Sequence, residues 1–153
     1  MVQTISLLGS TGSIGRQTLD VCREQGIRVA ALTARSSLDL LEEQARAFRP
    51  RLVAVTDLEP ALELARRLAG LDIEVAYGLD GLRRAASLPE SEAVVTAVVG
   101  MAALWPTMAA IEAGKRVAFA NKETLVCAGE LVMEAARRYG AEIVPVDSEH
   151  SAI

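Results

Sequence analysis

The chain contains few aromatic residues and only one histidine. Phe, Trp and Tyr together make up 3% of its 153 residues. A chain so poor in aromatic side chains lacks the stacking surface that proteins use to bind single-stranded nucleic acid. Its net charge of −4, with acidic and basic residues interspersed, provides no basic stripe for a phosphate backbone. We therefore expect no nucleic-acid partner.

Cysteine and long apolar runs are also scarce. Cys22 and Cys127 lie far apart in helix-like stretches, which argues against a disulfide framework or a zinc site, so we expect both to be reduced core thiols. No apolar stretch is long enough to span a membrane. The opening residues 1–10 lack the basic region of a signal peptide. We expect a cytoplasmic protein with no membrane partner.

Short apolar runs alternate with longer amphipathic stretches, and this order is typical of βαβ units in an α/β protein. The length fits one domain over residues 1–153. Strands are expected at Ile5–Leu8, Val29–Leu32, Leu52–Val55, Glu74–Tyr77, Ala93–Ala97, Arg116–Ala120 and Glu142–Val146. Helices are expected at Ser13–Gln25, Leu38–Phe48, Glu59–Leu68, Leu82–Ser87, Leu104–Ala113 and Glu123–Arg138, the last closed by a basic turn and Gly140.

The first strand leads through the glycine-rich stretch GSTGSIG, residues 9–15, into the first helix. Glycines at such a turn bring backbone N–H groups up to a phosphate at the positive end of a helix. The spacing is G-x-x-G-x-x-G, and a glycine-rich turn that binds nothing is the alternative, but the order of strand, loop and helix favours nucleotide binding. It predicts a Rossmann-like, doubly wound, mainly parallel sheet with helices on both faces. The expected cofactor-binding residues are Gly9, Thr11, Gly12, Ser13 and Ile14, with the Ser10 hydroxyl as a further donor.

The end of the second strand bears on the choice of dinucleotide. An NAD site usually has an acid there for the ribose 2′-hydroxyl, whereas a 2′-phosphate needs cations and hydroxyl donors. The chain offers donors and no acid until Asp39, so NADP(H) is favoured; these donors are Thr33, Arg35, Ser36 and Ser37. Alternatively, a serine caps the next helix and the arginine is an ordinary solvated charge.

Two later strand ends should face the same ligand. Val99, Gly100 and Met101 follow the fifth strand and should border the cofactor, while Met101 and Trp105 are more typical of packing residues than of a dedicated cofactor contact. Asn121, Lys122 and Glu123 begin the long helix, where they either contact ligand or serve as a helix cap and a dipole partner.

Two carboxylates follow the last expected strand. Asp147 and Glu149 are two residues apart, so in an extended stretch they point to one side while Ser148 points to the other. Paired oxygen donors suit Mg²⁺ or Mn²⁺. Two carboxylates make only half a site, and acids at a strand end are often solvated or cap a helix. His150 is more typically a structural hydrogen bonder than a base.

Taken together, GSTGSIG (residues 9–15), NKETLV (121–126) and PVDSEHSAI (145–153) closely resemble the 1-deoxy-D-xylulose 5-phosphate reductoisomerase family, NADPH-dependent enzymes of non-mevalonate isoprenoid biosynthesis. The resemblance covers the whole chain but not the whole enzyme. It implies that residues 11–14 contact NADPH, with Asn121 and Glu123 as later contacts. Many members carry a Gly-Lys-Asn-like run where this chain has Arg35, Ser36 and Ser37.

The resemblance also implies the chemistry. The family isomerises 1-deoxy-D-xylulose 5-phosphate on a divalent metal and reduces the product with NADPH to 2-C-methyl-D-erythritol 4-phosphate, as a homodimer. Its pattern makes Lys122 and Ser148 substrate contacts, Asp147 a metal ligand, and Glu149 a ligand of both metal and substrate, so that Lys122 and Glu149 are the catalytic candidates.

The acidic end of the chain would place its stop inside the start of the metal-binding and catalytic region. We therefore expect an NADPH-binding portion with little or no turnover by itself. The rival hypotheses are an NADP(H)-sensing regulatory module without catalysis and a semialdehyde dehydrogenase-like enzyme, which would need Cys127 as an exposed nucleophile.

Overall fold

The computed structural model describes residues 2–98, 101–120 and 122–145, without the side chains of Met101 and residues 122–128. In this part of the chain, seven strands form one sheet in the order β4-β3-β2-β1-β5-β6-β7, and every pairing is parallel. The strands are β1 (Thr4–Leu8), β2 (Arg28–Ala34), β3 (Leu52–Val55), β4 (Glu74–Tyr77), β5 (Ala93–Thr96), β6 (Arg116–Phe119) and β7 (Ile143–Pro145). The helices are α1 (Ser13–Gln25), α2 (Leu38–Phe48), α3 (Leu58–Arg67), α4 (Gly78–Ala86), α5 (Leu104–Glu112) and α6 (Lys122–Tyr139), with a 3₁₀ turn, η1 (Met101–Ala103), before α5.

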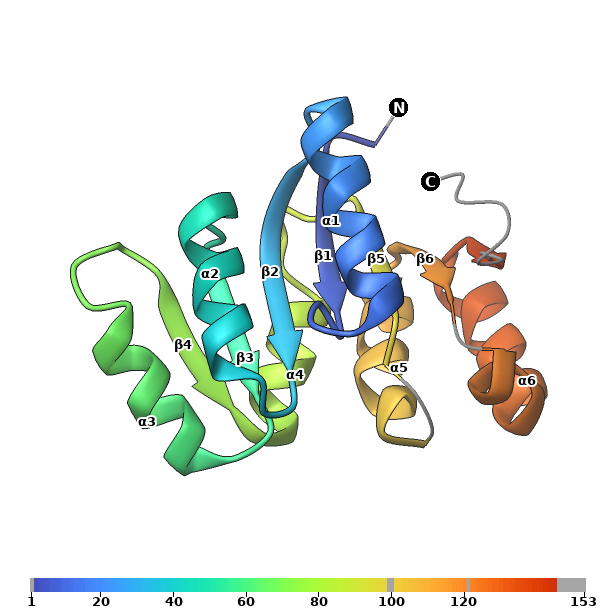
Figure 1. Ribbon diagram of the computed structural model, residues 1–153. Helices are drawn as coiled ribbons and strands as arrows, with labels where there is room; N and C mark the ends of the chain where they lie inside the picture. Colours follow the sequence, from blue (N-terminus) through green and yellow to red (C-terminus); the bar gives the residue numbers. More distant parts are fainter. Residues whose placement is uncertain (1, 99–100, 121, 146–153) are drawn as a thin grey trace.

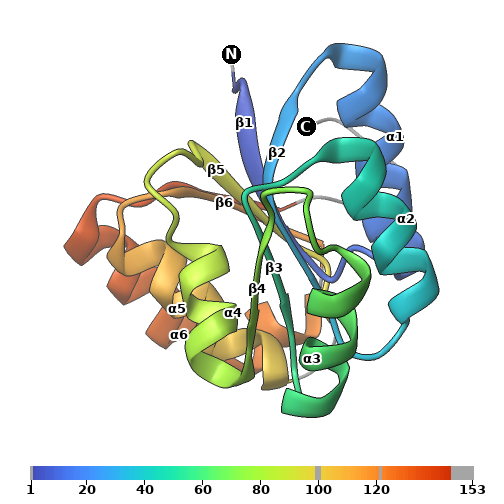
Figure 2. The ribbon, with the colours of Figure 1, turned by 90° about the vertical axis from the view of Figure 1, so that its left-hand side faces the viewer.

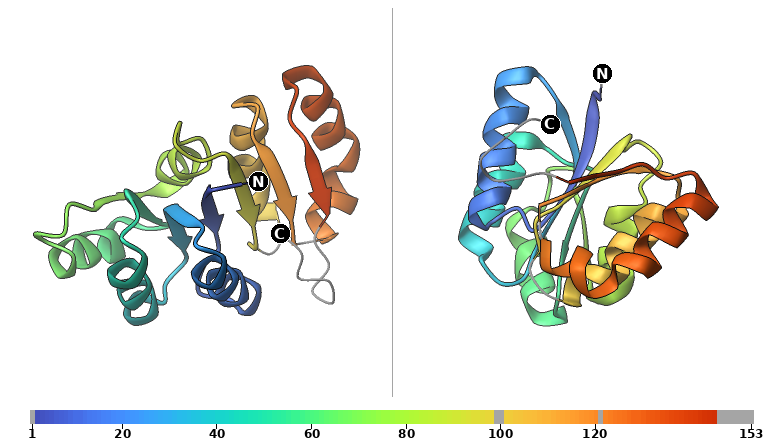
Figure 3. Two further views of the ribbon diagram at one scale, coloured as in Figure 1. Left: turned by 90° about the horizontal axis from the view of Figure 1, so that it is seen from above. Right: turned by 90° about the vertical axis from the view of Figure 1, so that its right-hand side faces the viewer.

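The sheet is covered on both faces, as Figures 2 and 3 show. Buried residues of α1, α2 and α3, among them Leu19, Leu41 and Leu64, pack with one set of strand side chains. Residues of α4, α5 and α6, such as Ile111 and Val132, pack with the alternate set. Because both faces are covered, the central strands are buried and mostly apolar, as in the fully buried LVAV of β3 and AVVT of β5. The predicted doubly wound α/β fold is confirmed.

Some element boundaries differ from the sequence prediction. Helix α4 begins at Gly78 rather than near Leu82, because Gly78 adopts a φ of 72° that lets the chain turn from β4 directly into the helix. Strand β2 continues to Ala34. The expected packing of Trp105 is wrong: the side chain is 52% exposed, since α5 turns Leu104, Thr107 and Ile111 inward instead. Val146 and the side chain of Met101 lie outside the described residues.

The strand order fixes where a ligand can reach the sheet. Strand β1 lies between β2 and β5, so chain connections run outward in opposite directions from this pair. In open parallel sheets such a reversal leaves a crevice outside the carboxyl ends of the two strands. The arrowheads of β1 and β2 mark that edge in Figure 1, and the glycine stretch that follows β1 therefore lies at the reversal point.

Cys22 belongs to the core layer under α1. It is 1% exposed and forms no disulfide. Burial raises the pKa of the Cys22 thiol to about 11, because the thiolate would lose its hydration. The expectation of a packed, reduced thiol is confirmed for Cys22, whereas the side chain of Cys127 lies outside the described residues.

We expect Cys22 to resist alkylation in the folded protein. At about pH 8 the buried thiol is almost entirely protonated, and the thiolate is the reactive form. After iodoacetamide treatment, mass spectrometry of the Cys22 peptide should show little modification under native conditions and full modification in guanidinium chloride. Equal rates under the two conditions would contradict the buried position of this thiol.

Candidate nucleotide-binding site

The loop between β1 and α1 is anchored to the end of β2. The N–H groups of Gly9 and Ser10 both donate to the Thr33 carbonyl oxygen, at 3.0 and 2.8 Å, and Gly9 N also lies 3.0 Å from Thr33 Oγ1. Gly9 has a φ of 85°, and a Cβ there would lie 3.0 Å from the Ala97 carbonyl carbon. Gly9 therefore shapes the turn, and its N–H is not free for a phosphate. The Thr33 side chain is buried, contrary to the sequence expectation that its hydroxyl is a donor for a 2′-phosphate.

A buried glutamine holds the same loop from α2. The Ser10 hydroxyl donates to Gln44 Oε1 at 2.7 Å, and Gln44 Nε2 donates to the Ser10 carbonyl oxygen at 2.9 Å. Both side chains are buried. The expectation that the Ser10 hydroxyl serves an anion is therefore wrong, because it is used inside the protein. Sequence reasoning missed Gln44, although a polar residue between Leu41 and Ala45 on the buried side of α2 was an available signal.

The remaining amides of the loop are uncommitted. No partner within the described ranges takes the N–H groups of Thr11, Gly12, Ser13 or Ile14. Gly12 is the N-cap of α1, no side chain caps the helix, and its first turn carries no acid. Open N–H groups at the positive end of a helix form a site for an anion. The predicted residues Thr11–Ile14 therefore come together in a geometry suited to a phosphate.

Two further features of the loop concern its charge and its packing. Arg16 Nε lies 3.4 Å from the Gly12 carbonyl oxygen and adds a positive charge that sequence reasoning missed. A Cβ at Gly15 would lie 2.1 Å from the Gly9 carbonyl oxygen, whereas a Cβ at Gly12 would meet nothing within 4 Å. Gly15 thus lets α1 pack against the loop, and Gly12 leaves open space into which a ligand can approach.

The turn between β2 and α2 presents unused polar groups. Arg35, Ser36 and Ser37 are exposed. Ser37 occupies the N-cap position of α2, yet its side chain makes no capping hydrogen bond. Arg35 forms no ion pair with any residue that the structure describes. The alternative interpretation of Ser37 as a side-chain cap is wrong, and these groups remain available for an anion.

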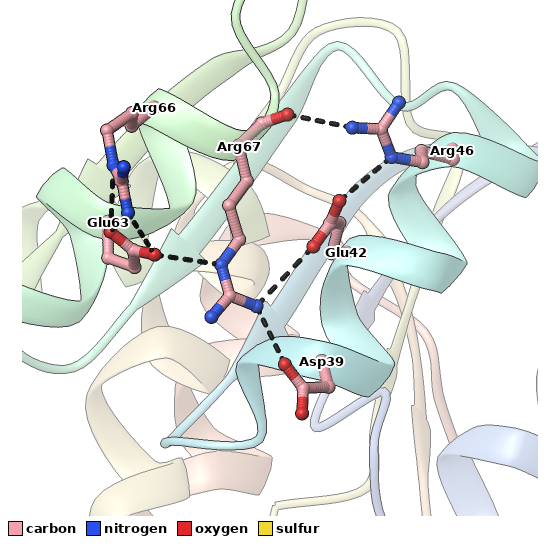
Figure 4. A network of polar contacts seen from close by, with 6 residues as sticks. All are labelled: Asp39, Glu42, Arg46, Glu63, Arg66 and Arg67. Carbon is pink, nitrogen blue, oxygen red and sulfur yellow. Dashed lines mark hydrogen bonds and ion pairs between the residues drawn. The ribbon is translucent and has the colours of Figure 1, made fainter.

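An ionic network links α2 to α3 beside this turn (Figure 4). Arg67 Nη1 lies 2.8 Å from Asp39 Oδ1 and 3.4 Å from Glu42 Oε1, and Arg67 Nε lies 3.1 Å from Glu63 Oε1. Hydrogen bonds from Arg66 and then Arg67 lower the pKa of Glu63. Hydrogen bonds to Asp39 and Glu63 raise the pKa of Arg67. Asp39, the first acid after β2, is therefore already paired.

Most of the other predicted site residues are not described. Gly100, Asn121, Asp147, Ser148 and Glu149 lie outside the described residues, as do the side chains of Lys122 and Glu123. The backbone of Lys122 begins α6, close to the predicted start of that helix. Strands β6 and β7 run parallel to β1 and so end at the same edge of the sheet as the glycine loop.

Among the residues described, no three His, Cys, Asp or Glu side chains are grouped to hold a metal ion. None of the helices described has the length and apolarity needed to cross a bilayer. A hollow of about 1410 Å³ lies at the opposite edge of the sheet, beside the starts of β1 and β4. Arg51 in its wall is paired with Glu90 at 2.7 Å, and the glycine loop takes no part in it.

Comparisons with known proteins agree with this geometry. The family model for 1-deoxy-D-xylulose 5-phosphate reductoisomerase matches residues 5–129. The curated enzyme of that name from Agathobacter rectalis is 55% identical in an alignment 153 positions long, which covers 99% of this chain and 40% of that protein. This chain thus spans about 40% of the length of the curated relatives it matches.

Solved structures give the same result. The 1-deoxy-D-xylulose 5-phosphate reductoisomerase from Zymomonas mobilis in complex with NADPH is 40% identical, with a TM-score of 0.91 over all of this chain and 41% of that one. A DOX-P reductoisomerase in complex with NADPH, fosmidomycin and magnesium is 42% identical, with a TM-score of 0.91 over 98% of this chain and 38% of that one. Sequence, fold and glycine loop agree, and the chain belongs to the 1-deoxy-D-xylulose 5-phosphate reductoisomerase family.

Proposed function

We propose that the chain binds NADPH through the loop between β1 and α1. The observation that carries this proposal is the row of uncommitted N–H groups of residues 11–14, on a loop that Thr33 and Gln44 hold in place. A pyrophosphate needs several fixed donors and no nearby side chain in its way, and Gly12 provides that clearance. Arg16 adds positive charge close by.

Arg35, Ser36 and Ser37 are proposed to receive the 2′-phosphate of the cofactor. Their positions at the end of β2, exposure and lack of internal partners support this role. Thr33 is not included, because its hydroxyl faces Gly9. Gly100, Asn121 and Glu123 complete the proposed set of cofactor contacts.

The whole protein is proposed to be an NADPH-dependent reductoisomerase acting on 1-deoxy-D-xylulose 5-phosphate. The family membership and the relatives in complex with NADPH and magnesium support this. NADPH supplies hydride, and a divalent ion supplies Lewis acidity. In this chain we propose that Asp147 and Glu149 bind Mg²⁺ or Mn²⁺. The proposed contacts to the sugar phosphate are Lys122, Ser148 and Glu149. Residues 1–153 are the proposed NADPH-binding domain. A cytoplasmic homodimer without nucleic-acid or membrane partners is part of the same proposal.

Titration with both nicotinamide cofactors tests the first step. Binding to the purified chain should change the fluorescence of NADPH. We expect the dissociation constant for NADPH to be at least about tenfold lower than that for NADH, because one charge-assisted phosphate contact can supply this difference. Circular dichroism should first verify that the chain is folded. Tighter binding of NADH, or no binding of NADPH by a folded chain, would refute the assignment.

Two alanine substitutions separate the loop's packing from its ligand contact. Gly12→Ala should lower stability by no more than about 1 kcal/mol, because its Cβ meets no protein atom and only the N-cap preference for glycine over alanine is lost. It should weaken NADPH binding about tenfold by blocking the approach of the phosphate. Gly15→Ala should instead destabilise the fold by about 1–3 kcal/mol, since its Cβ collides with backbone. Thermal melts and cofactor titrations measure the two effects, and undiminished NADPH binding by Gly12→Ala would contradict the proposed contact.

A further inference from the structure

Asp39 occupies a critical position for the choice between NADP(H) and NAD(H). It lies in the first turn of α2, four residues after Arg35, and its side chain is 98% exposed. In NAD sites an acid beyond the second strand accepts hydrogen bonds from the ribose 2′-hydroxyl. Asp39 lies beyond that position, inside α2, but a free carboxylate there would still repel a 2′-phosphate bound at the turn.

The carboxylate of Asp39 is not free, because Arg67 holds it from the neighbouring helix. Arg67 Nη1 contacts Asp39 Oδ1 at 2.8 Å, and Figure 4 shows the guanidinium reaching across from α3. Arg67 is itself fixed, since Glu63 accepts from its Nε and Glu42 lies within 3.4 Å of its Nη1. Its side chain is only 28% exposed, so contacts other than the one with Asp39 also hold the guanidinium in place.

The charges near the turn show why this contact bears on the cofactor. Arg35 has no ion-pair partner among the described residues and can meet a phosphate. Asp39 follows Ser37 by two residues, so their Cα atoms are at most about 7 Å apart. An unpaired carboxylate there would therefore lie within about one Debye length of a phosphate held by Ser37. Pairing with Arg67 offsets part of that negative charge and restrains the carboxylate on the side of α3.

We propose that Arg67 is a positioning residue for cofactor selection, which restrains Asp39 and offsets part of its charge so that the turn after β2 accepts a 2′-phosphate. This inference rests on the proposed NADPH function. It assigns a specificity role to a residue of α3 that lies outside the glycine loop and outside the turn itself.

The test compares dissociation constants for NADPH and NADH, measured by cofactor fluorescence and by calorimetry. Arg67→Met should lower the preference for NADPH by about threefold or more, the effect of one exposed charge contact. Arg66→Met is the matched control: it lies on the same helix and removes the same charge, but Arg66 contacts Glu63 and not Asp39. This control should leave the preference unchanged.

The double variant Asp39→Asn with Arg67→Met supplies the rescue. With the carboxylate gone, the preference for NADPH should return to the wild-type value, and Asp39→Asn alone should retain it. Because Asp39 is exposed, Asp39→Asn is expected to fold normally. Arg67→Lys keeps the charge but cannot contact Asp39 and Glu63 through separate nitrogens, so its preference for NADPH should fall between those of wild type and Arg67→Met.

Three outcomes would overturn the inference. First, Arg67→Met could weaken the binding of both cofactors equally, as a purely structural role predicts. Second, the double variant could fail to restore the preference for NADPH. Third, Arg66→Met could shift the preference as much as Arg67→Met does. Failure of the proposed function gives a different result, because the wild-type chain would then show no preference for NADPH before any substitution is made.

Discussion

The Thr33 carbonyl oxygen, which accepts the N–H groups of both Gly9 and Ser10, is the interaction on which the rest of the site depends. One acceptor at the end of β2 sets the path of the loop that leaves β1. Because these two amides are satisfied inside the protein, the loop cannot turn them toward a ligand. The amides of residues 11–14, one turn further along, are the ones left open at the start of α1. Anchoring and binding therefore use different parts of one short stretch.

Helix α2 connects this loop to the other end of the proposed cofactor site. Its buried side carries Gln44, which exchanges two hydrogen bonds with Ser10, and its first turn carries Asp39, which pairs with Arg67 of α3. Losing a partner of the buried pair leaves polar atoms unsatisfied, which costs more than losing an exposed ion pair. The buried Gln44–Ser10 contact therefore contributes to the rigidity of the loop. The exposed Asp39–Arg67 pair affects the charge beside the turn after β2 and has little effect on stability.

The sequence predicted the sheet, the helices and the glycine loop well, because these follow from local patterns. Buried runs such as LVAV of β3 and the glycine stop after α6 carry their own signals. What it could not predict were contacts between distant segments. The Ser10 hydroxyl was predicted to donate to a bound anion, because its actual partner Gln44 is 34 residues away in the sequence. Trp105 read as a core residue because its chemistry is apolar, yet its place on α5 faces it outward.

The same distinction explains why cofactor choice cannot be read from the turn after β2 alone. Asp39 is present in the sequence and, taken by itself, counts against a 2′-phosphate. Its effect depends on whether a cation meets it, and that cation comes from α3, 28 residues further along the chain. The packing of α2 against α3 thus determines how strongly the Asp39 carboxylate acts on a phosphate bound at the turn after β2. A specificity residue can lie wherever the fold brings a counter-charge to an acid at the edge of the site.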